Sequence, residues 1–116
     1  MFHRSRADGA FYTCTNLALT SLPSGVIIIG PDAFMGCTYI TLSSLPSTVT
    51  TIGNEAFIGC TSLALVNLNA TTPPTLGGNA FADTHASLAI RVPSANVSAY
   101  HGATNWSTYA SRINAQ

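Results

Sequence analysis

Apolar residues return along the chain at a fixed interval of 23 positions. The interval is clearest for two residue types that sit in nearly the same phrase each time: Phe11, Phe34 and Phe57, and Cys14, Cys37 and Cys60. A period between roughly 20 and 50 residues is typical of repeat proteins, in which similar units stack and each covers the apolar side of its neighbour. The pattern therefore predicts a stacked repeat array.

Aliphatic residues follow the same interval. Their columns are Leu17, Ile40 and Leu63; Leu19, Leu42 and Leu65; and Leu22, Leu45 and Leu68. A fourth unit is irregular, because Leu76-Gly77 and Ala80-Phe81 return one residue late. The segment Thr71-Thr72-Pro73-Pro74 therefore contains a single-residue insertion.

Each unit carries signals for short strands and tight turns. Pro46 ends the first strand of its unit because proline has no N–H group for a strand ladder. Gly53 permits a turn into the next Ala-Phe phrase. Asp32 and Glu55 are predicted to begin a short helical turn, whose dipole favours a negative charge. Each phenylalanine of the repeat should fill the interior.

Written from its cysteine, the unit reads C-T-x-[LI]-x-L-x-x-L-P-S-x-V-x-x-I-G-x-[DE]-A-F-x-G. This pattern resembles the BspA-type leucine-rich repeat of bacterial surface antigens, and the resemblance covers residues 10–92. It implies a repeat solenoid: a right-handed leucine-rich-repeat coil of short β-strands and turns with a short C-terminal helical cap. It also implies a secreted or surface-anchored protein used in adhesion, without catalysis.

Three segments are expected along the chain. They are a disordered or flexible N-terminal tail at 1–9, the solenoid of about three and a half units at 10–93, and the C-terminal cap at 94–116. In the cap, Trp106 precedes Tyr109 by three residues, and Tyr109 and Ile113 would share one helix face. These side chains are predicted to cover the last coil.

The first unit begins at its Ala-Phe phrase, with no preceding strand and no polar cap, which favours a fragment of a longer array. An uncapped rung exposes apolar side chains and unpaired strand groups. Self-association through this N-terminal rung is therefore predicted, with Phe11, Leu17 and Leu22 as its apolar members.

One column departs from the pattern of the family. The family has an inward aliphatic residue six positions after the cysteine, where this chain carries Thr20, Ser43 and Val66, and the leucines stand one position earlier. In a regular strand those leucines would form an exposed ladder with a polar rim. This candidate binding or oligomer face consists of Leu19, Ser21, Leu42, Ser44, Leu65 and Asn67. The alternative is a bulge after Leu19 that turns all three leucines of the first unit inward.

The composition of the chain argues against some classes of function. Hydrophobic residues make up 47% of the 116 residues and charged residues only 7%, against roughly a quarter in ordinary globular chains. The formal net charge is zero and lysine is absent, so no basic stripe exists for nucleic acid. No apolar run approaches the roughly 20 residues that span a membrane, and the N-terminus lacks the apolar stretch of a signal peptide.

The reactive residues offer no catalytic, cofactor or metal site. Stacked cysteines form a column with neighbours roughly 4.8 Å apart, which suits small buried hydrophobes, although a disulfide between adjacent rungs is an alternative. A column does not converge as metal ligands must. The three histidines are scattered, and Asp32 and Glu55 share a column that the turn itself explains. No enzymatic activity is expected.

The sequence therefore predicts a binding module that presents a repetitive, low-charge face to a protein or glycan. The alternative is a structural spacer or stalk segment of a larger surface protein, with a uniformly polar strand face and no ligand of its own. A glycan-directed enzyme or its accessory module would need carboxylates clustered near aromatics, and the sequence has no such cluster.

Overall fold

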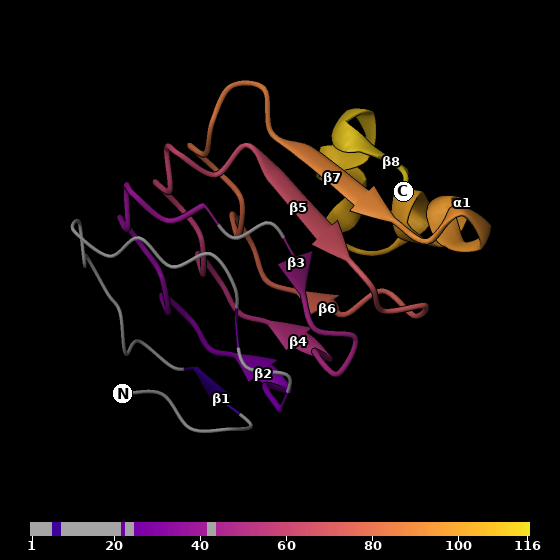
Figure 1. Ribbon diagram of the computed structural model, residues 1–116, viewed down its shortest axis with the longest axis horizontal. Helices are drawn as coiled ribbons and strands as arrows, with labels where there is room; N and C mark the ends of the chain where they lie inside the picture. Colours follow the sequence, from indigo (N-terminus) through magenta and orange to yellow (C-terminus); the bar gives the residue numbers. More distant parts are fainter. Residues whose placement is uncertain (1–5, 8–21, 23–24, 42–43) are drawn as a thin grey trace.

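The computed structural model describes residues 6–7, 22, 25–41 and 44–116. Its strands are β1 (Arg6–Ala7), β2 (Ile28–Ile29), β3 (Ser44–Leu45), β4 (Thr51–Ile52), β5 (Leu65–Leu68), β6 (Thr75–Leu76), β7 (Ala89–Val92) and β8 (Ile113–Ala115). They form two four-stranded parallel sheets, ordered β1-β2-β4-β6 and β3-β5-β7-β8. Successive units lie side by side from the N-terminal to the C-terminal end (Figure 1).

The register of the strands reproduces the period of the sequence. Ile28 of β2 pairs with Thr51 of β4, 23 positions later, and Thr51 pairs with Thr75 of β6, 24 positions later. The second sheet makes the same step of 24 between Leu65 and Ala89. Both longer steps span residues 71–74, so the predicted insertion lies between β4 and β6 in the first sheet and between β5 and β7 in the second.

The interior is built from the repeated apolar columns. Phe34, Phe57 and Phe81 are buried. The Phe57 ring stacks between the other two, with centroid distances of 5.3 Å to Phe34 and 5.4 Å to Phe81. Cys37 and Cys60 are buried beside them. The prediction that the repeated aromatic and thiol side chains share one interior is confirmed for these residues, whereas Phe11 and Cys14 lie outside the described part.

The acidic column begins a tight turn, as predicted, but the turn does not continue as a helix. Asp32 and Glu55 both have φ of 59°, in the left-handed region, so the acidic residue itself does not have helical backbone geometry. The segments that follow are tight turns closed by bonds three residues apart, such as Met35 N–H to the Asp32 carbonyl. The residue after each phenylalanine-centred turn is also left-handed, with φ of 71° at Gly36. Short polar or glycine residues suit these positions.

Gly53 is needed for space rather than for turning. Its backbone is not left-handed, but a Cβ atom added to it would lie 2.5 Å from the Pro31 nitrogen and 2.7 Å from the Gly30 carbonyl carbon. Gly77, in the same column, faces the backbone of Asn54 in the same way. The glycine of each unit therefore lets successive coils approach closely, which corrects the predicted role.

The C-terminal segment contains three short helices and a strand. The helices are η1 (Ser94–Asn96), α1 (Val97–Gly102) and η2 (Trp106–Arg112), and β8 follows directly. Tyr109 and Ile113 do not share a helix face, because η2 is kinked at Tyr109 and Ile113 begins β8, paired with Ile90 of β7. Trp106 and Ile113 are nevertheless buried, and Tyr109 packs against the same core. They cover the last coil.

Strand β1 lies inside the segment predicted as a flexible tail. Arg6 and Ala7 pair with Ile28 and Ile29 of β2, so these two residues form the edge of that sheet. The division of the chain into a tail, a solenoid and a cap stays a prediction. Of the predicted uncapped rung, Phe11 and Leu17 lie outside the described residues. Leu22 is buried, with 8% of its surface exposed. Self-association at this end stays a prediction.

Candidate functional site

The outer face of the β3-β5-β7-β8 sheet carries the described members of the predicted binding face. Strand β5 alternates regularly: Leu65 is 40% exposed and Val66 is 1% exposed, and Asn67 is half-buried before the buried Leu68. Leu63, before the strand, is also buried. Leu65 and Asn67 therefore point away from the core.

The register brings further residues onto this face. Asn67 pairs with Ser44 of β3 and with Arg91 of β7, and Arg91 pairs with Asn114 of β8. Ala89 lies beside Leu65. The result is a polar row across four strands, next to a shorter row of Leu65 and Ala89. We call these residues the strand face: Ser44, Leu65, Asn67, Ala89, Arg91 and Asn114.

Half of the predicted face lies outside this description. Leu19, Ser21 and Leu42 are not among the described residues, so the leucine ladder as a whole stays a prediction. Conversely, the sequence interpretation missed Arg91 and Asn114. Arg91 carried a signal, because it stands between the inward Ile90 and Val92 of the last predicted strand. The sequence gives no such signal for Asn114, because β8 does not belong to a repeated unit.

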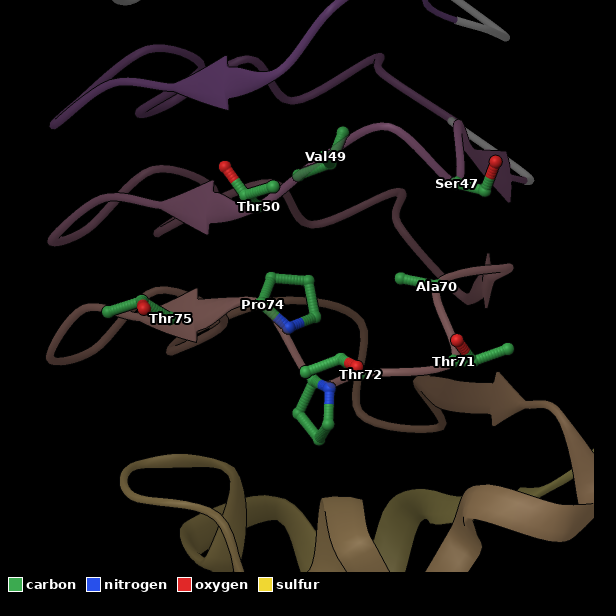
Figure 2. Close-up of a pocket in the computed structure, with 9 residues that line it drawn as sticks. Ser47, Val49, Thr50, Ala70, Thr71, Thr72, Pro74 and Thr75 are labelled. Carbon is green, nitrogen blue, oxygen red and sulfur yellow. The ribbon is translucent and has the colours of Figure 1, made fainter.

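A second surface feature is a recess beside the insertion. It has a volume of about 370 Å³ and is lined by Ser47, Val49, Thr50 and residues 70–75. Figure 2 shows that these residues come from two successive coils, with residues 47–50 on one and residues 70–75 on the next. We call it the threonine recess. The insertion was recognised in the sequence, but its consequence for the surface was not.

The cap holds the last coil through side-chain hydrogen bonds to backbone carbonyls. The Tyr100 hydroxyl donates to the Ala70 carbonyl at 2.6 Å, and the indole N–H of Trp106 donates to the Pro74 carbonyl at 2.7 Å. The Asn105 amide donates to the Leu76 carbonyl at 2.7 Å. These donors take the place of a further strand beside β6. Burial raises the pKa of Tyr100 to about 12, so its hydroxyl remains a donor at neutral pH.

Within the cysteine column, the environment of Cys60 keeps its thiol unreactive. Burial raises the pKa of the Cys60 thiol to about 12, and the neighbouring Cys37 thiol adds to the rise. The Cys60 thiol donates to the Phe34 carbonyl at 3.0 Å. A thiol that stays protonated is neither a nucleophile nor a metal ligand. Cys60 therefore acts as a small core residue.

The remaining chemistry-bearing side chains do not gather. Among the described residues, no group of three or more His, Cys, Asp or Glu side chains could hold a metal ion. None of the helices in that part of the chain is long and apolar enough to cross a membrane. The arrangement offers surfaces for contact: the strand face and the threonine recess.

Comparison with known families gives one match. The model of the BspA type leucine rich repeat region matches residues 5–108, in six copies. The match covers nearly nine-tenths of the chain and begins just before β1. A search of curated proteins finds no match.

Proposed function

Because the chain belongs to the BspA-type leucine-rich repeat family, we propose that it is a non-enzymatic binding module of a bacterial cell-surface or secreted protein. Proteins of this family are generally binding or scaffold modules without catalytic activity. The short parallel strands and the 23-residue register support a right-handed solenoid. Its role would be adhesion through a protein or glycan partner.

The strand face is the observation that carries this proposal. Leu65 is a large apolar side chain, 40% exposed, and the other described residues of the strand face are small or polar. Arg91 lies exposed in the adjacent row. An apolar centre with a polar rim is the usual anatomy of a protein interface, and arginine is enriched among the residues that dominate binding energy. The face has little net charge, which matches the chain as a whole.

The test is a binding experiment with immobilised full-length chain. A panel of host extracellular-matrix proteins and mucin glycoproteins is passed over the surface, and saturable binding to at least one of them is expected. Leu65→Ser should weaken that binding by about tenfold or more, because truncating a central apolar residue removes a main contribution to the interface. Intact cells of the source organism should also be labelled by an antiserum against the chain.

Ile27→Ser is the matched control. Ile27 is 41% exposed, so it equals Leu65 in accessibility and chemistry, but it adjoins β2 of the other sheet. If both substitutions change binding equally, or neither does, the strand face is not the interface. If no member of the panel binds, the spacer interpretation replaces this one, and the polar row from Ser44 to Asn114 would then be a solvated surface.

A further inference from the structure

The threonine recess has a lining rich in hydroxyl groups. Five of its nine residues are Ser or Thr, the others are Val, Ala and Pro, and none carries a charge. Its volume of about 370 Å³ falls at the lower end of the range for small-molecule sites, roughly 300–1,000 Å³. The recess is therefore large enough for one small ring-sized ligand and has no group that would select an ion.

Most of these hydroxyl groups have no hydrogen-bond partner among the described residues. Within the described residues, the side chains of Ser47, Thr71, Thr72 and Thr75 make no hydrogen bond, and that of Thr50 makes only a long one, 3.4 Å, to the Ile27 carbonyl. A hydroxyl both donates and accepts. The lining can therefore pair with donors and acceptors alike.

Side chains of the C-terminal cap hold one wall of the recess in place through hydrogen bonds. The insertion spans residues 71–74, and the carbonyl groups at its two ends, those of Ala70 and Pro74, accept hydrogen bonds from Tyr100 and Trp106. Both aromatic side chains are fully buried. Two adjacent prolines stiffen the segment further. A site fixed before binding loses less entropy when a ligand arrives.

We propose that the threonine recess binds the terminal unit of a neutral carbohydrate. Sugar hydroxyls match the hydroxyl lining, and the C–H faces of a sugar ring can pack on the prolines and on Val49. A charged ligand finds no counter-charge in the lining. A peptide strand finds no open edge at this point, because the Thr75 N–H already donates to the Thr50 carbonyl at 2.9 Å. The proposal rests on the proposed binding role, but it uses a different surface from the strand face.

The test is an NMR titration of the ¹⁵N-labelled full chain with methyl glycosides of glucose, galactose, mannose and N-acetylglucosamine. At least one glycoside should cause saturable shifts confined to the amides of residues 47–50, 70–72 and 75, since Pro73 and Pro74 have no N–H. The double variant Ser47→Ala/Thr72→Val, which removes one hydroxyl from each coil while preserving shape, should weaken binding by roughly tenfold. Thr61→Val, at an exposed threonine outside the recess, should leave it unchanged.

Several results would overturn the proposal. These are the absence of saturable shifts with every glycoside, shifts centred on other residues, unchanged affinity in the double variant, or equal binding of glucuronate or of a Ser/Thr-rich peptide. Leu65→Ser separates this inference from the proposed function, because it should reduce partner binding at the strand face while leaving the sugar titration intact. Sugar binding that fails while Leu65-dependent binding persists removes the carbohydrate site alone.

Discussion

Replacing Gly53 by alanine tests how closely successive coils of the array approach. A Cβ atom at this position would lie 2.5 Å from the Pro31 nitrogen, whereas ordinary contacts begin at 3.4 Å. The neighbouring coil would therefore have to move by roughly 0.9 Å. The obstacle is backbone, so no side chain can rotate aside. The strain must be absorbed by the stack itself.

That displacement would break hydrogen bonds between the coils. The Gly53 N–H donates to the Ile29 carbonyl at 2.7 Å, and the Asp32 N–H donates to the Asn54 carbonyl at 3.0 Å. Both would be stretched beyond the limit of a real hydrogen bond, about 3.5 Å. Each such bond contributes about 0.5–1.5 kcal/mol net, and overpacking a close-packed site costs about 1–3 kcal/mol. We expect Gly53→Ala to lower the free energy of unfolding by about 2–4 kcal/mol.

Urea unfolding measures this effect. The expected loss corresponds to a fall of about 1–2 M in the urea midpoint for a chain of this size. Far-UV circular dichroism reports the whole array, and the fluorescence of Trp106, the only tryptophan, reports the C-terminal end. Gly78→Ala is the control, because a Cβ atom there meets nothing within 4 Å; its effect should lie between zero and a gain of about 1 kcal/mol. Equal midpoints for both variants and the native chain would refute the close approach of the coils.

Three further predictions concern single side chains. Phe57→Ala should cost about 3–5 kcal/mol in urea unfolding, because the ring is stacked between two others and only 1% exposed; a loss below about 1 kcal/mol would mean that the stack collapses around the gap. The free energy of unfolding should fall as pH rises from 10 towards 12, because the pKa of Tyr100 is about 12 in the folded chain but 10.0 in the unfolded chain. Tyr100→Phe should reduce this alkaline loss of stability. At neutral pH the same variant should cost about 1–2 kcal/mol, because the Ala70 carbonyl loses its hydrogen-bond donor; urea midpoints across the pH series measure both effects. Glu55→Asn should raise the melting temperature by the equivalent of about 0.5–1 kcal/mol, since φ is 59° at Glu55 and 57° at Asn79 of the next unit; an unchanged or lower melting temperature would show that the left-handed turn does not strain the glutamate.

The repeated part of the fold could be predicted because each apolar position of the repeat occurs in several units of the sequence. The interval of 23 positions became the strand register, and the late return of Leu76 and Ala80 became the longer step across residues 71–74. The burial of Phe34 and Phe57 follows from the same logic. Repetition shows which positions face inward, because every unit must cover its neighbour in the same way.

The turns and the C-terminal cap could not be predicted from repeated positions in the sequence. The sequence indicates a turn that begins at Asp32, but it does not show that Asp32 itself is left-handed, with its N–H bonded to the Asn54 carbonyl of the neighbouring coil. Strand β8 belongs to no repeated phrase, so Ile113 was assigned to a helix. The donors Tyr100 and Trp106 depend on where carbonyl groups emerge from the last coil, which is a property of the assembled stack.

The position of the insertion follows from the same close packing. An extra residue between two interior coils would push against a backbone neighbour, because the glycine column leaves no clearance there, as the contacts of Gly53 show. Residues 71–74 instead have Thr71 and Thr72 exposed, and the cap side chains Tyr100 and Trp106 donate to the Ala70 and Pro74 carbonyl groups without requiring a regular strand edge. The insertion therefore bulges outward without breaking the register of β6 with β4. In an array of similar units, the coil next to the cap is where a distinct recess can form at the least cost to the stack.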